Sequence, residues 1–300
     1  TSIISLLLTL GGEMELKNIV KYTLVILFVY ALFTGNFLSF FRKSTENKIV
    51  QLKGSDTILS LSQTVAEEYM RQHPQARISV TGGGSGTGIA SKINKTVDIA
   101  MASREMKDSE YEKAEKNGTI IKEVTIAYDA ITIVVNKKNK INNLTMEQLR
   151  DIYIGKIKNW KELGGEDKEI VVISRDSSSG THMYFKEHVL RKGKSKGKEE
   201  FGNKTLFLPS NESIKQQITT GEGTISYLGL GYLDETVKPL KIDGITANVE
   251  NVKNKTYPIS RGVYWYTDEK IEGITKKLVD FMMSKEGQKI VETEGFVPVN

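Results

Sequence analysis

The 300-residue sequence contains no cysteine. This absence excludes disulfide bonds, thiolate metal sites, cysteine nucleophiles and lipid attachment to an N-terminal cysteine. A strong charge of one sign is missing as well, because 42 Lys and Arg residues stand against 37 Asp and Glu residues and leave a net charge of +5. So small an excess over this length does not indicate a nucleic-acid-binding protein.

The composition that is present describes a folded chain. Hydrophobic residues make up 39% of the sequence and charged residues 26%, which is enough apolar material to bury a core. A typical domain has about 100–200 residues. The length therefore predicts two domains or two lobes.

A long apolar run lies near the N-terminus. Residues 22–41, YTLVILFVYALFTGNFLSFF, carry no charge and are about as long as a bilayer-spanning helix. The place of this run favours an export signal or an uncleaved anchor within residues 14–47, with its apolar part in 19–41; a buried core helix is the alternative. Because no cysteine can carry a lipid, we expect a retained helix to hold an exported protein at the outer face of the cytoplasmic membrane or in a periplasm-like space.

The first thirteen residues do not resemble the start of a protein. Thr1 is not an initiating residue, whereas Met14 opens a typical basic leader, MELKNIVK. The segment Gly11-Gly12-Glu13 has the character of a translated ribosome-binding site. We expect Met14 to be the true start and residues 1–13 to be a non-native upstream extension.

From Lys48 onward, short β-branched runs alternate with helical patterns, which is typical of an α/β fold. The predicted strands are ARISVTG (76–82), VDIAMAS (97–103), DAITIVVN (129–136), EIVVISR (169–175) and TISYLG (224–229). Helices are expected over 58–73 and 274–293. Thr145 and Gln148 form a predicted capping box at the start of another helix.

Residues 186–204 contain seven basic residues among glycines, KEHVLRKGKSKGKEEFGNK. Such a run could contact a phosphate-rich polymer. Glu199 and Glu200 interrupt it, however, and no aromatic series accompanies it for stacking on bases. We interpret the run as a solvated loop and expect no nucleic-acid partner.

Three clusters rich in Gly, Ser and Thr follow predicted strands and precede predicted helices. They are residues 54–57 (GSDT), 82–88 (GGGSGTG) and 175–181 (RDSSSGT). Helix N-termini offer free backbone N–H groups, glycines admit close approach, and hydroxyls donate further hydrogen bonds. Any one cluster is equally typical of ordinary caps and turns.

Together, however, the three clusters predict a site for a tetrahedral oxyanion at the carboxyl ends of the strands. Arg175 can grip two oxygens at once. Ser103 ends the run VDIAMAS and Arg104 follows it; the two form a fourth junction of the same kind.

Other motifs do not match. The sequence lacks GxxxxGK[ST] and GxGxxG, so it has no Walker loop and no dinucleotide fingerprint. Ser85 does not lie in a GxSxG nucleophile elbow, because Thr87 stands where glycine is needed. His73 and His188 show no metal-ligand spacing, and no metal or cofactor is expected. A hydrolase that uses Ser179 or Ser85 is kept as an alternative, although no general base stands at a motif spacing.

At this point the chain resembles a known family. GSDTI, GGGSGTGI, DIAMASRE, DAITIVVN, IYIGKIKNW, SRDSSSGT, ISYLGLGYLD and GFVPV follow one another in the order of the phosphate-binding component of phosphate ABC transporters. The resemblance spans about residues 50–300. It implies a type II periplasmic-binding fold, in which two α/β lobes joined by two crossings hold phosphate in the cleft between them.

Carried over to this chain, the resemblance places lobe I at 48–135 and 262–300 and lobe II at 136–261, with crossings near Asn136 and Arg261. It implies a binding protein that is not an enzyme, needs no cofactor, acts as a monomer and passes phosphate to permease subunits. The phosphate-binding residues that it implies are Thr57, Ile58 through its backbone N–H, Ser85, Ser103, Arg104, Arg175, Ser179, Gly180 through its backbone N–H, and Thr181.

One position departs from the best-known pattern of the family. That pattern has a carboxylate after the second loop to accept a proton from phosphate, whereas this chain has Arg104. A buried acceptor rejects sulfate, which has no proton to donate at neutral pH. We select Asp56 as the proton acceptor, with Asp129 and Asp176 as alternatives. The departure also leaves open a different oxyanion: sulfate, molybdate or tungstate.

Overall fold

The computed structural model describes residues 21, 23–27, 30, 49–194 and 196–299. The chain divides into two units, residues 1–48 and 49–300. In the first unit, the described residues between 21 and 30 are helical. The predicted extension over 1–13 and most of the predicted signal or anchor over 14–47 lie outside the described residues. None of the helices in the described part of the chain is long and apolar enough to span a bilayer.

The strands of the second unit are short, apart from two. They are β1 (Val50–Gly54), β2 (Ile78–Thr81), β3 (Ile99–Ala102), β4 (Ile121–Val135), β5 (Asn143–Leu144), β6 (Val171–Arg175), β7 (Leu206–Leu208), β8 (Thr224–Gly229), β9 (Lys238–Pro239), β10 (Lys241–Ile242) and β11 (Ser260–Asp268).

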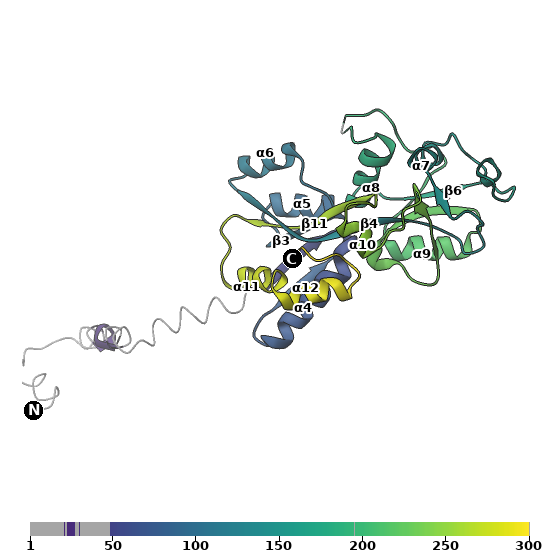
Figure 1. Ribbon diagram of the computed structural model, residues 1–300. Helices are drawn as coiled ribbons and strands as arrows, with labels where there is room; N and C mark the ends of the chain where they lie inside the picture. The colour runs from purple at the N-terminus through teal and green to yellow at the C-terminus, as the bar shows by residue number, and fades with distance from the viewer. Residues whose placement is uncertain (1–20, 22, 28–29, 31–48, 195, 300) are drawn as a thin grey trace, which may run out of the picture. The chain divides into compact units, whose positions relative to one another are not determined.

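Helices alternate with these strands (Figure 1). They are α4 (Leu59–Gln72), α5 (Ser85–Ile93), α6 (Asp108–Lys116), α7 (Met146–Tyr153), α8 (Gly180–Phe185), α9 (Asn211–Thr220), α10 (Val249–Lys253), α11 (Gly273–Met282) and α12 (Lys285–Thr293). Short turns of other helix types are η1 (Asp56–Ile58), η2 (Trp160–Leu163), η3 (Lys186–Leu190) and η4 (Leu230–Tyr232).

One mixed sheet runs through the unit in the order β2-β1-β3-β11-β4-β8-β6-β7, with β9 also paired to β4. The outer strand pairs are parallel, whereas β11 and β4 run antiparallel to their neighbours in the middle. β4 changes partner along its length, since Ile121 to Ala130 pair with β11 and Ile131 to Val135 pair with β8. The α/β prediction is confirmed.

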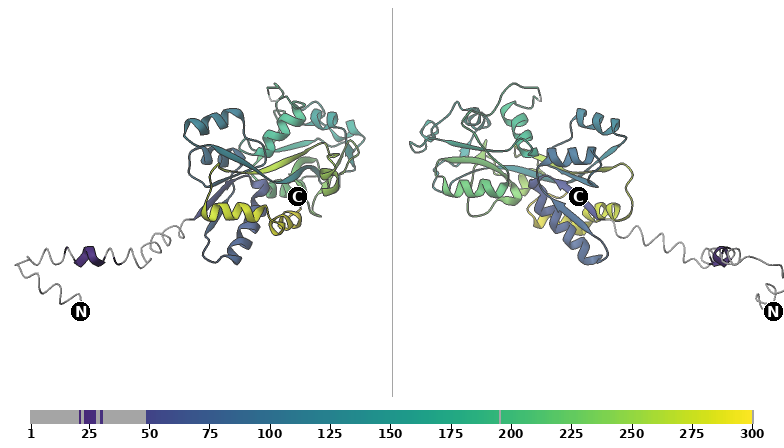
Figure 2. Two further views of the ribbon diagram at one scale, coloured as in Figure 1. Left: turned by 60° about the vertical axis from the view of Figure 1, so that its left-hand side comes forward. Right: turned by 180° about the vertical axis from the view of Figure 1, so that it is seen from behind.

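The buried apolar residues divide at the place where β4 changes partner. Two clusters draw their members from residues 50–127 and 263–296. The other two draw theirs from residues 130–259, with Val297 added. In Figures 1 and 2 the green middle of the chain accordingly gathers on one side of β4 and β11, and the purple and yellow segments gather on the other.

Local patterns explain several elements. Leu61, Val65 and Tyr69 recur every four residues and are buried on one face of α4, as helical spacing requires. Thr145 accepts from the Gln148 N–H while the Gln148 side chain accepts from the Thr145 N–H, so the predicted capping box is confirmed.

Two predictions of element length are wrong. β4 begins eight residues before the predicted strand over 129–136. Its first residues mix charged, polar and apolar side chains without a regular alternation and carry a weaker pattern. The single helix predicted over 274–293 is two helices. Ser284 separates them by accepting the Gly287 N–H and capping α12, and a cap of this kind starts a new helix.

Candidate functional site

Three loops converge at one end of the strands. Residues 54–57 follow β1, residues 82–88 join β2 to α5, and residues 175–181 join β6 to α8. The backbone ties them together: the Gly84 N–H donates to the Gly54 carbonyl at 2.9 Å, and the Gly86 N–H donates to the Ser178 carbonyl at 3.0 Å. The three clusters that the sequence singled out therefore form one site.

Hydroxyl groups fill the centre of this site. The Thr57 and Thr181 Oγ1 atoms lie 2.8 Å apart. The Ser55 hydroxyl donates to Ser103 Oγ at 2.9 Å, and Ser85 Oγ lies 3.3 Å from Ser103 Oγ. All five side chains are buried, so their hydrogen-bond capacity is satisfied within the protein or by a bound ligand.

Some hydroxyl hydrogens of this cluster are not used within the protein and are available to a ligand. Ser55 accepts the Thr57 N–H and uses its own hydrogen on Ser103, and Ser85 accepts the Ser103 N–H. A hydroxyl has one hydrogen to give. The Ser85–Ser103 pair therefore shares one hydrogen and has one to spare, and the same holds for the Thr57–Thr181 pair. The cluster can direct two hydroxyl hydrogens to an acceptor.

Gly180 is required by the closeness of these side chains. A Cβ atom at this position would lie 2.3 Å from Ser85 Oγ and 2.8 Å from Ser103 Oγ. Any other residue would therefore push the third loop away from the second. Gly180 also opens α8, where the first backbone N–H groups of a helix have no intrahelical acceptor.

Arg175 ends β6 at the start of the third loop and is 1% exposed. Its Nη2 donates to Asp56 Oδ2 at 3.0 Å and to the Pro209 carbonyl at 2.7 Å. Its buried Nε and Nη1 have no partner among the described residues. A buried guanidinium with unpaired N–H groups on two nitrogens fits an oxyanion ligand.

Asp56, the selected proton acceptor, is already engaged. Its Oδ2 accepts from Arg175, and its Oδ1 accepts from the Gly83 N–H at 3.0 Å. Asp176 is engaged within its own turn, where it accepts the Ser178 N–H and hydroxyl. Both carboxylates hold the loops in shape.

Arg104 makes contacts that differ from those expected of an anion ligand. Its guanidinium forms a two-pronged ion pair with Glu110, with both N–O distances at 2.8 Å. Burial tends to raise the pKa of Glu110, but the Arg104 fork and the Lys107 N–H outweigh burial and lower it. The side chain that follows Ser103 is thus tied to the start of α6.

Arg261 also contacts residues of the site. The sequence predicted only that it lies near a crossing between the two lobes. Its Nη2 donates to Thr181 Oγ1 at 2.7 Å and to Asp129 Oδ2 at 3.2 Å, and its Nη1 donates to the Ser103 carbonyl at 2.6 Å. The SRGVYWYT run around Arg261 is rich in β-forming residues, which is the signal that could have revealed β11.

Asp129 is fully buried between Arg261 and the Leu230 N–H, which donates to Oδ1 at 3.0 Å. Burial raises the pKa of Asp129 and lowers that of Arg261, despite the attraction between the two groups. A Cβ atom on Gly229 would lie 3.1 Å from a Thr57 methyl carbon and 3.3 Å from Asp129 Oδ2, which places this carboxylate next to the hydroxyl cluster.

The contacts of Ser179 and Ile58 are also defined. The Ser179 hydroxyl accepts the His182 backbone N–H as the cap of α8. The His182 ring donates from Nδ1 to the Arg175 carbonyl at 2.8 Å, so this ring is directed at the backbone and not at the Ser179 hydroxyl. The Ile58 side chain is buried in the core beneath the first loop, and its N–H belongs to η1.

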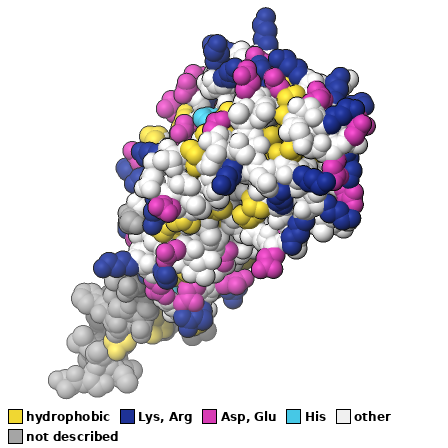
Figure 3. Space-filling model, turned by 45° about the vertical axis from the view of Figure 1, so that its right-hand side comes forward, with side chains coloured by type: hydrophobic (Ala, Val, Ile, Leu, Met, Phe, Trp, Pro, Cys, Tyr) yellow, Lys and Arg dark blue, Asp and Glu magenta, His cyan; other side chains and the backbone are white. Residues whose placement is uncertain are grey.

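The basic run over 186–204 is partly neutralised by its own glutamates. Lys186 and Arg191 both pair with Glu200, and Arg150 pairs with Glu199. On the face drawn in Figure 3, basic and acidic side chains are interspersed. Within the part of the chain that the structure describes, no group of His, Asp and Glu side chains is placed to hold a metal ion.

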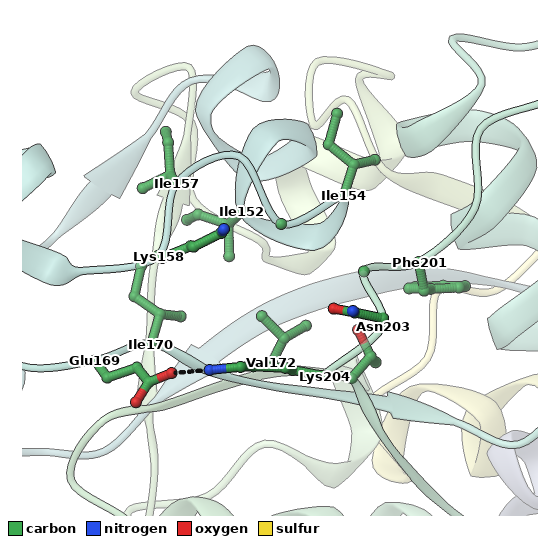
Figure 4. A pocket seen from close by; sticks show the side chains of 13 residues that line it. Ile152, Ile154, Ile157, Lys158, Glu169, Ile170, Val172, Phe201, Asn203 and Lys204 are labelled. Atoms are coloured by element: carbon green, nitrogen blue, oxygen red, sulfur yellow. Dashed lines mark hydrogen bonds and ion pairs between the residues drawn. The ribbon is translucent and has the colours of Figure 1, made fainter.

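A cavity of about 390 Å³ lies apart from the three loops (Figure 4). Its walls include Ile152, Ile154, Ile170 and Val172, and Glu169 pairs with Lys204 at its rim at 2.9 Å. Its lining mixes aliphatic residues with polar and charged ones, and it contains no arginine and none of the clustered hydroxyls of the three loops.

Comparison with known proteins places these features in a family. The PBP superfamily domain matches residues 42–286. The phosphate-binding protein PstS of Borreliella burgdorferi is 31% identical over 282 residues, which cover 92% of this chain and 98% of that protein. PstS of Bacillus subtilis is 33% identical, with 83% and 80% covered.

A solved structure shares the fold. The putative phosphate ABC transporter substrate-binding protein of Clostridium perfringens, determined with bound phosphate, superposes with a TM-score of 0.77 and 36% identity. The match covers 84% of this chain and 100% of that one.

Proposed function

Because this chain belongs to the PBP superfamily, and within it to the PstS family of phosphate-binding proteins, we propose that it captures inorganic phosphate and delivers it to an ABC transporter. Binding needs no covalent step. The ligand-binding residues of this proposal are Thr57, Ile58, Ser85, Ser103, Arg175, Ser179, Gly180 and Thr181.

The observation that carries the proposal is the environment of Arg175. This buried guanidinium has two nitrogens, Nε and Nη1, without partners among the described residues. It pairs with Asp56 of the first loop, whose neighbour Thr57 belongs to a cluster of buried hydroxyls that has hydrogens to spare. Because the site has more hydrogen-bond donors than acceptors, it favours a ligand that accepts many hydrogen bonds and donates few. A phosphate dianion has four oxygens and a single hydrogen, and matches that demand.

We further propose that the second unit works as two lobes, 48–135 with 262–300 and 136–261, which close over the anion. The separation of the apolar clusters near residues 127–130 and 259–263 supports this division. The change of partner along β4 supplies a crossing where the two halves can bend. Closure of such lobes around a ligand is a signal that a permease can recognise.

For the proton of phosphate we propose Asp129 as the acceptor in place of Asp56. Asp56 is ion-paired with the ligand-binding residue Arg175 and accepts the Gly83 N–H, so it holds the first loop and Arg175 in place. Asp129 also has a donor on each oxygen, but it is fully buried beside the hydroxyl cluster. Burial raises the pKa of Asp129, which favours its taking up a proton. A buried acceptor that lacks a proton donor is costly by about 1–3 kcal/mol, which disfavours sulfate.

The proposed function also implies a cellular location and an oligomeric state. An exported chain held outside the cytoplasmic membrane by its 19–41 segment would meet phosphate before the permease subunits do. We propose that it acts as a monomer, because a cleft that opens and closes is simplest in a single copy. Arg104 is engaged with Glu110, and we leave it out of the ligand set.

The second candidate is another oxyanion: sulfate, molybdate or tungstate. The residue that follows Ser103 is an arginine and not a carboxylate, which removes one known means of selecting phosphate. Calorimetric titration of the purified protein with each anion separates the two candidates. Tight binding of phosphate with weak binding of the other three supports the proposal, and a preference for any of the others contradicts it.

A further inference from the structure

Arg261 connects groups that come from four different segments of the chain. Its guanidinium donates to the Ser103 carbonyl after β3, to Asp129 on β4 and to the Thr181 hydroxyl at the start of α8, and Arg261 itself lies on β11. The side chain is 2% exposed. Its guanidinium carbon also lies 5.6 Å from the centre of the Tyr184 ring, within the range of a cation–π contact.

The contact with Thr181 restricts what its hydroxyl can do. Thr181 Oγ1 has two lone pairs and one hydrogen. Arg261 occupies one lone pair, and the Thr57 hydroxyl, 2.8 Å away, engages either the second lone pair or the hydrogen. If Thr57 donates, Thr181 keeps its hydrogen for a ligand; if Thr181 donates, Thr57 keeps its own.

Without Arg261, the pair could turn an unoccupied lone pair of Thr181 toward the anion, and two acceptors would then face each other. A misdirected hydroxyl loses a hydrogen bond and adds repulsion. The guanidinium therefore controls the direction of the hydroxyl pair in addition to holding the segments together.

We infer that Arg261 is a positioning residue of the anion site, which acts through Thr181 to direct a hydroxyl hydrogen at the bound oxyanion. The inference rests on the proposed function, since it concerns the same site. It goes beyond that function because it assigns a role in binding to a side chain that does not itself contact the ligand through its terminal nitrogens. Both of these nitrogens donate hydrogen bonds to other groups of the protein.

The three acceptors around residue 261 explain why this position is an arginine. One guanidinium nitrogen reaches Asp129 and Thr181 together while the other reaches the Ser103 carbonyl. This use of two separate nitrogens needs the planar fork of arginine. A lysine has a single nitrogen and can retain the attraction to Asp129, but it cannot make all three contacts in the same geometry.

A double-mutant cycle tests the inference. Phosphate affinity is measured by calorimetry on the full chain and on its Arg261→Lys, Thr181→Val and doubly substituted variants. Each single variant is expected to bind phosphate about 10–100-fold more weakly, from the loss of one charge-assisted hydrogen bond or its direction. The double variant is expected to be within about 2-fold of Thr181→Val alone, because Arg261 acts through that hydroxyl.

The control for surface charge is Lys253→Ala, an exposed cation near the same stretch of β11, which should bind like the unmodified chain. Urea unfolding of each variant checks that it is folded; if Arg261→Lys is unfolded, Arg261→Gln takes its place in the cycle.

The outcomes separate the two claims. If the unmodified chain binds phosphate and the losses in the double variant multiply, Arg261 has a general structural role and the inference is overturned alone. If the unmodified chain does not bind phosphate, the proposed function and the inference fall together.

Discussion

Replacement of Arg175 by alanine is the perturbation with the largest predicted effect on ligand binding. The side chain is buried, and its Nε and Nη1 are the two donors left without partners among the described residues. Alanine removes both donors. It also leaves Asp56, which accepts from Arg175 Nη2 at 3.0 Å, as an uncompensated negative charge beside the anion.

The magnitude follows from the number of contacts. A hydrogen bond to a charged group contributes about 1.5–3 kcal/mol, so two of them contribute about 3–6 kcal/mol. At about 1.4 kcal/mol for each factor of ten, phosphate should bind roughly 10²–10⁴-fold more weakly to Arg175→Ala. Arg175→Lys should recover part of this loss, because it keeps the charge but not the two-pronged geometry.

The assay is calorimetric titration with phosphate, accompanied by urea unfolding to confirm that the variants are folded. Arg191→Ala is a matched control, since Arg191 is also a largely buried arginine and pairs with Glu200 outside the three loops. Its phosphate affinity should be unchanged. If Arg175→Ala bound phosphate as tightly as the unmodified chain, the assignment of this site would be refuted.

Three further predictions concern other parts of the site and its surroundings. Gly180→Ala should abolish measurable phosphate binding in calorimetry, because the new methyl group would displace Ser85; unchanged affinity would contradict the packing described. Asp129→Asn should weaken binding of phosphate more than binding of sulfate, and an equal loss for both anions would count against Asp129 as proton acceptor. The lowered pKa of Glu110 means that its pair with Arg104 stabilises the fold above pH 4.5 and that this contribution is lost as the pH falls. The unfolding free energy of Glu110→Gln should therefore vary less with pH below 4.5 than that of the unmodified chain, and equal pH dependence of the two would show that the pair contributes nothing.

The three loops could be predicted because their signals are local. Glycine, serine and threonine next to a strand end and a helix start have the same meaning wherever the strand lies in the sheet. The loops then meet because strand ends meet at one edge of the sheet. Thr57, Ser85 and Thr181 accordingly lie within one cluster of hydroxyls.

Arg261 could not be assigned to the site in the same way. Its contact with the Ser103 carbonyl joins residues 158 positions apart, and it depends on the antiparallel placement of β11 between β3 and β4. No local pattern predicts that placement. Arg104 is the reverse case. Its place next to Ser103 predicted an anion-binding residue, whereas in the structure its guanidinium pairs with Glu110, six residues later.

The strand lengths show how context extends a local signal. The predicted strand over 129–136 contains the residues of β4 that are buried on both faces. The earlier half of β4 includes exposed charged residues, and it is strand because β11 pairs with it along its length. Pairing partners that are distant in sequence therefore decide where such a strand begins.

The central claim is that the site formed by the three loops selects inorganic phosphate. Competitive calorimetry of the full chain with phosphate, sulfate, molybdate and tungstate at neutral pH tests it most directly. The account predicts tight one-to-one binding of phosphate and about 5–100-fold weaker binding of sulfate, as expected when a buried acceptor loses its donor. Equal affinity for phosphate and sulfate, or tighter binding of molybdate or tungstate, would contradict it.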